Sequence, residues 1–294
     1  MKIAALQQFP PHAYGDSRGK DITELKEIAK SSVDRCLELV AEAAKQGADL
    51  AVTIETVNAY LALGDTRYVY GETLESDTVK RFSEAAKKHK LHIVAGLALN
   101  IDGDPFNCAV LFDDEGKIVG IHKKVHLPAG EELHYKHGDR FEVFNTKLGN
   151  IGMLVCWDMQ FPEAARELAL GGADLIACPT YGWENIYGLS RAYENSVYIA
   201  VGMCTYPRGL FAENDPSCVV DNMGKVLAAV PRNDEGVAVA DVDISKEPDP
   251  QYGSEAFYPS HSMRKTRFSQ RRTDTYKLVN KPLEETPLYK RYFK

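Results

Sequence analysis

Three polar side chains stand at or near the ends of apolar, strand-like segments, and their types are those that nucleophilic catalysis requires. Cys156 ends the run GMLVC, Glu55 ends the run DLAVTIE, and Lys124 lies within GIHKKVHLP. A cysteine nucleophile needs a base to take its proton, donors for the developing oxyanion, and a rigid support. The sequence therefore offers the components of thiol-dependent acyl transfer.

The segment around Cys156 predicts the rigid support. A short strand runs into the cysteine, and Pro162 and Glu163 mark the start of a helix a few residues later. A thiol at such a strand-to-helix elbow is exposed at the sheet edge. We expect the backbone N–H of Trp157 to point to the place where an oxyanion would form.

Each of these residues also has a purely structural explanation. A free cysteine is often a buried small hydrophobe, and a glutamate at a strand end is often a solvated surface residue. A lysine at a strand edge discourages pairing with other strands. Alternation along 121–126 puts His122, Lys124 and His126 on one face. Taken one at a time, the residues leave both interpretations open.

Alternating strands and helices must position these residues. Helices are predicted at 22–46, 75–90, 162–171 and 186–196. Strands are predicted at 2–9, 49–56, 92–100, 174–179 and 198–206, with hairpins at 107–126, 141–157 and 217–231 and a strand after them. The second hairpin is expected to turn near Leu148, Gly149 and Asn150. This order predicts an α/β fold, an αββα sandwich of two mixed sheets flanked by helices.

Composition excludes several classes of function. A net charge of -7 over 294 residues argues against a nucleic-acid or anionic-membrane partner. No segment reaches the roughly 18 apolar residues of a membrane span, and the first residues do not read as a signal peptide. Six scattered cysteines without a CxxC pair favour a reduced, cytoplasmic protein. No HxxxH or HExxH helix is present, so we expect no metal and no other cofactor.

The ordered set of motifs resembles the nitrilase superfamily of carbon–nitrogen hydrolases. The matching stretches are IETVNAY, HKKVHLPAGEELHYKHGD and GMLVCWDMQFPEAAREL. The similarity extends to KIAALQQ, GGADLIACPT, RAYENSVYIAVGM and DNMGKVLA, and so spans roughly residues 1–245. The chain departs from the family in one respect, because Ile54 stands where a proline commonly precedes the base glutamate.

The resemblance implies roles for individual residues. Glu55 would be the general base toward Cys156, and Lys124 with the Trp157 N–H would stabilise the tetrahedral intermediate. A second glutamate best matches Glu132, with the adjacent Glu131 as the alternative. The loops after the catalytic strands are expected to contact the substrate through Asn58, Tyr60, Glu131, Tyr135, Thr180, Tyr181 and Trp183. An acidic rim of Asp65, Glu72 and Glu131 would suit a substrate that carries an amine.

The resemblance also implies the reaction. We expect hydrolysis of a C–N bond in a small linear amide or N-carbamoyl amine, through a thioester or carbamoyl-enzyme, with release of ammonia. The block CWDMQFPEAAR is most similar to the N-carbamoylputrescine amidase branch. Nitrile hydrolysis and a catalytically silent regulatory subunit remain the alternatives. A papain-like protease is disfavoured, because no histidine has an obvious partner asparagine.

Members of this superfamily are usually homo-oligomers in which two sandwiches form a four-layer core. Residues 1–245 are accordingly expected to form the hydrolase domain. Residues 246–294 lack clear periodicity and are rich in Tyr, Arg and Pro. They are expected to form a C-terminal arm that packs on a neighbouring subunit.

Overall fold

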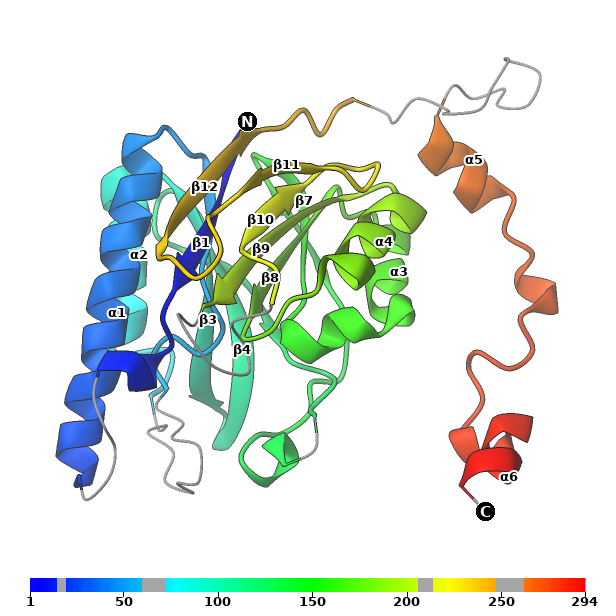
Figure 1. Ribbon diagram of the computed structural model, residues 1–294, viewed down its shortest axis with the longest axis horizontal. Coiled ribbons are helices and arrows are strands. Elements are labelled where there is room, and N and C mark those ends of the chain that lie inside the picture. Colours follow the sequence, from blue (N-terminus) through cyan, green and yellow to red (C-terminus); the bar gives the residue numbers. More distant parts are fainter. Residues whose placement is uncertain (15–19, 60–71, 129, 206–213, 247–261, 294) are drawn as a thin grey trace. The chain divides into compact units, whose positions relative to one another are not determined.

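The computed structural model describes residues 1–14, 20–59, 72–128, 130–205, 214–246 and 262–293. The chain forms two compact units, Met1–Lys246 and Glu247–Lys294. The first unit carries all of the strands in the described part of the chain (Figure 1).

In the described part of the chain, twelve strands form two halves of six that are joined along one edge. The first half has the order β5 (Ile118–Lys123), β4 (Asp104–Phe112), β3 (His92–Ile101), β2 (Leu50–Val52), β1 (Lys2–Gln8) and β12 (Gly236–Asp241). The second has the order β6 (Val143–Thr146), β7 (Gly149–Met153), β8 (Leu175–Thr180), β9 (Tyr198–Cys204), β10 (Cys218–Val220) and β11 (Val226–Ala229). Parallel pairing of Gln7 with Met203 and of Gln8 with Cys204 joins the halves.

The helices lie on the outer faces of the two halves (Figure 1). Helices α1 (Ile22–Lys45) and α2 (Asp77–His89) cover the first half, and α3 (Pro162–Leu170) and α4 (Asn185–Asn195) cover the second. Asp21 caps α1 by accepting from the N–H groups of Thr23 and Glu24, and Glu24 reciprocates toward Asp21. Short 3-10 helices occur at Pro11–Tyr14, Glu131–Leu133 and Cys156–Gln160.

The central strands are apolar on both faces because each face is buried. In β1, Ile3 and Ala5 belong to the core between the two sheet halves, together with Leu175 and Ala200 of the second half. The alternate residue Leu6 packs in the other core, which α1 and α2 cover. The predicted αββα arrangement of two mixed sheets flanked by helices is confirmed.

The structure also corrects several predicted boundaries and pairings. Strands β3 and β4 form a long antiparallel hairpin, from Ile93 with Phe112 to Ile101 with Asp104, that the sequence analysis did not identify. The β6–β7 hairpin turns at Lys147–Leu148, because Thr146 already pairs with Gly149. Strand β2 ends three residues before Glu55.

The second unit contains short helices where the sequence analysis expected an extended arm. They are α5 (Met263–Ser269) and α6 (Pro287–Tyr292), with 3-10 turns at Thr273–Thr275 and Leu283–Glu285. Each helix is short enough to escape detection by periodicity.

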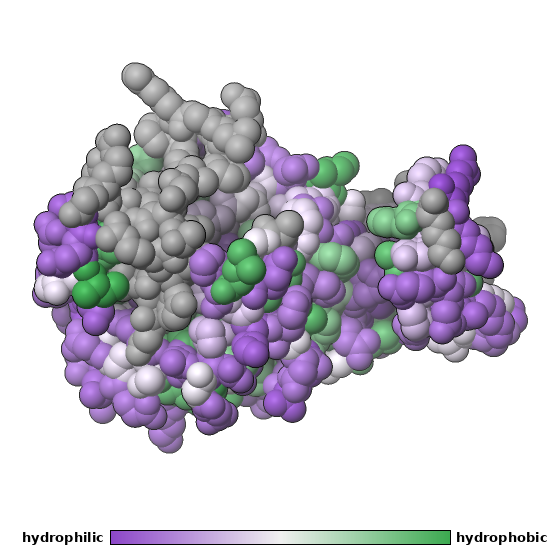
Figure 2. Space-filling view, turned by 90° about the horizontal axis from the view of Figure 1, so that it is seen from below, coloured by the Kyte–Doolittle hydropathy of each residue, from purple (hydrophilic) through white to green (hydrophobic). Residues whose placement is uncertain are grey.

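No described helix combines the length and the apolarity needed to cross a membrane. Over the coloured, described residues, the face shown in Figure 2 is largely hydrophilic, with apolar residues scattered among them.

Two glycines make room for the segment that carries Glu55. A Cβ on Gly96 in β3 would lie 2.3 Å from the Ile54 carbonyl oxygen and 2.7 Å from the Glu55 Cα. A Cβ on Gly202 in β9 would lie 2.1 Å from the Thr53 carbonyl oxygen. Both contacts are with backbone, so the Glu55 segment must move if either glycine gains a side chain.

We predict that Gly96→Ala destabilises the fold by about 1–3 kcal/mol, the usual cost of overpacking a rigid core. Gly236→Ala in β12 is the matched control, because its Cβ would lie 3.4 Å from the nearest atom, a Val230 methyl group. Urea unfolding of both variants checks the prediction. Equal unfolding midpoints would contradict the prediction, because they would show that the backbone at Glu55 can move without a loss of stability.

Candidate active site

Cys156 lies at a strained strand-to-helix elbow, as the sequence predicts. Strand β7 ends at Met153, a 3-10 helix begins at Cys156 itself, and α3 begins at Pro162. The φ angle of Cys156 is +43°, which is rare for a residue with a side chain and typical of functional sites. Trp157, which is 41% exposed, contributes an N–H in the first turn of that helix, where backbone donors lack helical partners.

A buried cluster of one ammonium and two carboxylates forms the charged part of the site. Lys124 directly follows β5 and is 2% exposed. Its Nζ donates to Glu55 Oε1 at 2.8 Å and to Glu131 Oε2 at 2.7 Å. Burying an ammonium is favourable only when it is paired and hydrogen-bonded, and here it has both.

Asn107, in the middle of β4, connects the two carboxylates from a second side. Its Nδ2 donates to Glu55 Oε1 at 2.7 Å and to Glu131 Oε1 at 2.9 Å. The remaining oxygen of Glu55, Oε2, accepts from the Tyr181 N–H at 2.9 Å. Both oxygens of Glu55 are therefore fixed in orientation.

The structure places Glu131, and not Glu132, in this cluster. Glu131 begins the 3-10 helix Glu131–Leu133, and the next residue of that turn points elsewhere. Glu132 is exposed, and its carboxylate accepts from the Gly130 N–H at 2.9 Å. The position expected for Glu132 is therefore taken by its neighbour, because the two side chains leave the turn in different directions.

The electrostatics of the cluster keep the lysine charged. Burial alone would lower the pKa of Lys124, but the charges of Glu55, Cys156 and Glu131 outweigh it, and the pKa is raised. The pKa of Glu131 is also raised. Burial is the main cause and the charge of Glu55 adds to it, while Lys124 acts in the opposite direction. Glu131 therefore holds a proton more readily than a solvated glutamate does.

The thiol of Cys156 is held in its protonated form. Burial and then the charge of Glu55 raise its pKa to about 11, although Lys124 and hydrogen bonds with the Thr180 side chain and the Tyr181 backbone lower it. The charge of Lys124 favours the thiolate, but burial and the charge of Glu55 outweigh it. Deprotonation therefore requires a base at hand, and Glu55 is the nearby carboxylate.

Two predicted substrate contacts lie beside this cluster. Thr180 ends β8 with no exposure, and its Oγ1 donates to the Gly182 carbonyl at 2.6 Å. Tyr181 follows it and supplies the N–H that reaches Glu55. The backbone N–H of Tyr181 thus interacts with both Glu55 Oε2 and the Cys156 thiol.

The other predicted contacts are buried or lie outside the described residues. Trp183 is 1% exposed, donates from Nε1 to Asn185 Oδ1 at 2.9 Å, and packs edge-on against Tyr187. Its contacts are those of a core side chain. Tyr135 is 4% exposed and packs in a small apolar cluster with Ala59 and Ala98. Tyr60 is not among the described residues.

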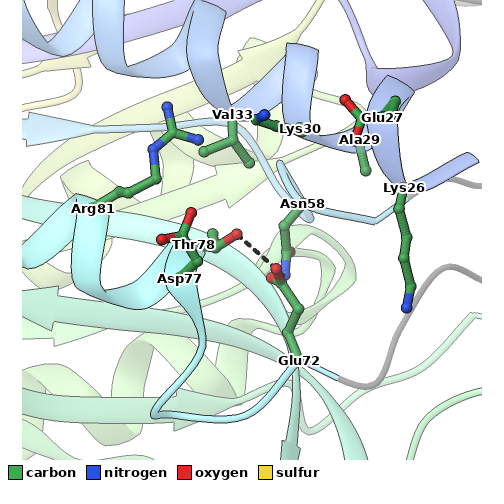
Figure 3. Close-up of a pocket in the computed structure, with 10 residues that line it drawn as sticks. All are labelled: Lys26, Glu27, Ala29, Lys30, Val33, Asn58, Glu72, Asp77, Thr78 and Arg81. Atoms are coloured by element: carbon green, nitrogen blue, oxygen red, sulfur yellow. Dashed lines mark hydrogen bonds between the residues drawn. The ribbon is translucent and has the colours of Figure 1, made fainter. Parts of the chain in front are cut away.

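Asn58 and Glu72 line a separate cavity of about 300 Å³ between α1, α2 and the segment after β2 (Figure 3). Asn58 Oδ1 accepts from the Ala98 N–H at 2.8 Å, and its Nδ2 donates to Glu72. Glu72 also accepts from Thr78 Oγ1 at 2.7 Å.

Cations line the same cavity, namely Lys26, Lys30 and Arg81. Of the predicted acidic rim, Glu72 and Glu131 are thus already bonded to protein donors, and Asp65 lies outside the described residues. Selection of an amine by such a rim stays a prediction.

The sequence analysis missed two buried polar residues of the site. Asn107 is 1% exposed in an otherwise apolar strand, and Asp158, two residues after the cysteine, has no exposure. A polar residue within a buried run was the available signal in the first case. Within the described ranges, no group of three or more His, Cys, Asp or Glu side chains is arranged to hold a metal ion.

We predict opposite shifts of the Cys156 pKa in two variants. Glu55→Gln removes a negative charge and lowers the pKa of the thiol, whereas Lys124→Met removes a positive charge and raises it. The pH dependence of alkylation by iodoacetamide, followed at Cys156 by mass spectrometry, measures both shifts. Five of the six cysteines are buried, so the label reports on this thiol. Shifts of the same sign would contradict the charge arrangement.

Comparison with known proteins gives the family. The carbon-nitrogen hydrolase family model matches residues 4–247. The omega-amidase NIT2 of Mus musculus is 28% identical over 76% of this chain and 87% of its own. A nitrilase of Pyrococcus abyssi is 32% identical over 70% of this chain and 81% of its own. An N-carbamoylputrescine amidase of Oryza sativa is 28% identical over 52% of this chain and 54% of its own.

Solved structures agree with this result. Nit3 of Saccharomyces cerevisiae, a member of branch 10 of the nitrilase superfamily, has a TM-score of 0.67 at 25% identity, covering 82% of this chain and 89% of that chain. An amidase of Nesterenkonia AN1 from the same superfamily has a TM-score of 0.66 at 25% identity, covering 82% and 90%. The fold, the motifs and the family match agree, and the chain belongs to the carbon-nitrogen hydrolases of the nitrilase superfamily, which are hydrolases acting on C–N bonds.

Proposed function

We propose that this enzyme hydrolyses a small linear amide or an N-carbamoyl amine through a covalent intermediate on Cys156 and releases ammonia. The observation that carries the proposal is the buried Glu55–Lys124–Glu131 cluster, whose charges act on the thiol at the Cys156 elbow. The mouse and rice relatives, an omega-amidase and an N-carbamoylputrescine amidase, support the two substrate classes.

In the first step, the thiol attacks the carbonyl carbon, and its proton passes to Glu55 Oε2. Lys124 has three N–H donors, and two of them reach Glu55 and Glu131. One N–H remains for the oxyanion of the tetrahedral intermediate, together with the backbone N–H of Trp157. Such preorganised donors typically contribute about 10²–10³-fold to the rate.

In the second step, the C–N bond breaks, and the departing nitrogen takes the proton from Glu55, so that ammonia leaves. A thioester remains on Cys156, or a carbamoyl-enzyme when the substrate is a ureide. Glu55 then takes a proton from water, the resulting hydroxide adds to the carbonyl, and the C–S bond breaks. The sulfur recovers its proton from Glu55, and the acid product leaves.

We predict that Cys156→Ala lowers ammonia release by at least about 10³-fold, as loss of a nucleophile does, without loss of the fold. The substrate panel contains N-carbamoylputrescine, N-carbamoyl amino acids, short aliphatic amides, glutamine-like omega-amides and a nitrile. Each compound is given to wild type and variant, with products identified by mass spectrometry. An unchanged rate in the variant would end the proposal.

The panel also separates the alternatives. Cys156-dependent turnover of a ureide assigns the carbamoylase branch, and turnover of plain amides alone assigns the amidases. Turnover of the nitrile alone would replace amide hydrolysis by nitrile hydrolysis. Silence on every compound, with a thiol that still reacts with iodoacetamide, would favour the regulatory-subunit alternative over these substrates.

We also propose that Glu131 acts in the reaction and that Glu132 does not. Glu131→Gln removes the carboxylate that pairs with Lys124 and is expected to lower kcat by about 10²-fold, within the range of acid–base and electrostatic contributions. Glu132→Gln changes an exposed side chain and is expected to leave kcat within about twofold of wild type. Steady-state kinetics on one substrate compares the pair, and a reversed order of the two effects would overturn the assignment.

We further propose that the protein is a cytoplasmic homo-oligomer to which the second unit contributes a subunit contact. All six cysteines are free thiols, as in a reducing compartment. Exposed apolar side chains recur through the second unit, at Tyr276, Leu278, Val279, Leu283, Leu288, Tyr292 and Phe293. Sedimentation equilibrium of the full chain tests the assembly, and a monomer at micromolar concentration would contradict it.

A further inference from the structure

The carboxylate of Asp158 is a buried hydrogen-bond centre beside the proposed nucleophile. It has no exposure and lies two residues after Cys156. Its Oδ1 accepts from the N–H groups of Val125 at 3.2 Å and His126 at 2.8 Å, and lies 2.9 Å from His126 Nδ1. Its Oδ2 accepts from the Val155 N–H at 3.2 Å and lies 2.8 Å from His122 Nε2.

These partners come from the two segments whose relative position matters for the chemistry. Val155 directly precedes Cys156, whereas His122, Val125 and His126 flank Lys124 on both sides. One carboxylate therefore ties the elbow that carries the thiol to the strand end that carries the ammonium.

Asp158 is ionised and fully partnered. Burial would raise the pKa of this carboxyl, but the hydrogen bonds from His122 and His126 and the charge of His122 outweigh it and hold the pKa well below its ordinary value. A buried carboxylate with this many donors is stable, whereas the loss of a donor leaves a desolvated charge.

Aromatic rings fix the orientation of both histidines. Phe161, at the start of α3, stacks on His126 with ring centroids 3.7 Å apart and planes inclined by 10°. Phe141 stacks on His122 at 5.7 Å and on His126 at 6.0 Å. The ring nitrogens are therefore directed at Asp158 by packing as well as by hydrogen bonding.

We propose that Asp158, held by His122 and His126, is a positioning residue that sets the placement of Lys124 relative to the Cys156 thiol. This deepens the proposed function, since correct placement of the ammonium serves both the thiol and the oxyanion. It does not depend on the substrate, because the reactivity of the thiol reports on the placement directly.

Matched histidine variants test the proposal. His122→Gln and His126→Asn keep an N–H donor near the position of the ring nitrogen that faces Asp158, whereas His122→Leu and His126→Leu remove it. If Lys124 moves away from the thiol, the pKa of Cys156 rises. A rise of one pKa unit slows alkylation by iodoacetamide at pH 8 about tenfold.

We expect slowed alkylation and a lowered kcat with little change in KM in the leucine variants, and recovery of both in the amide variants. Circular dichroism and the unfolding midpoint establish that each variant is folded. His126, whose side chain is 27% exposed, is the substitution that the fold tolerates more easily. Should His122→Leu fail to fold, the His126 pair alone decides the question.

Two results would overturn the proposal. Folded leucine variants that alkylate with the pH profile of wild type would show that Asp158 only stabilises the fold. Amide variants as slow as the leucine variants would show that the donor is not what matters. A chain without turnover on any substrate but with the expected alkylation profiles would refute the proposed function and leave the positioning role intact.

Discussion

The structure of the site depends on one constraint, which is that the ammonium of Lys124 is buried and must be compensated. A buried lysine is stable only if opposite charges and acceptors surround it in good geometry. Glu55 and Glu131 meet this requirement, Asn107 holds both carboxylates in place by donating to them, and each of the three comes from a different segment of the chain. The sheet order that brings β2, β4 and β5 into one half of the fold is therefore inseparable from the chemistry.

The same cluster governs the state of the thiol. Counted at their formal charges, Glu55, Glu131 and Lys124 together carry one negative charge. A thiolate at Cys156 would add a second negative charge in a buried site, so burial first and the charge of Glu55 next raise the pKa of the thiol. The free enzyme thus keeps its proton on sulfur and avoids the unproductive reactions of an exposed thiolate. In the proposed mechanism, proton transfer from the thiol to Glu55 becomes favourable only when the substrate carbonyl accepts the developing charge.

Much of this arrangement could be predicted from the sequence, and the exceptions have physical reasons. Apolar periodicity identifies the layers, and the ends of the apolar segments identify Glu55, Lys124 and Cys156 as candidates, because both features are local in the sequence. The choice between Glu131 and Glu132 depends on the direction of one 3-10 turn, which spacing does not encode. Asn107 and Asp158 could not be given partners, because hydrogen bonds across 24 to 52 residues follow only from the folded sheet.

The pairing of β1 has a consequence for synthesis of the chain. This strand lies between β2 and β12, and its register with β12 joins Lys2 to Asp241. While the chain emerges from the ribosome, one edge of β1 has no partner until almost all of the first unit has been made. An apolar strand with an open edge is prone to pair with other chains. The hydrolase unit therefore closes late, and a nascent chain needs protection of its first strand until β12 arrives.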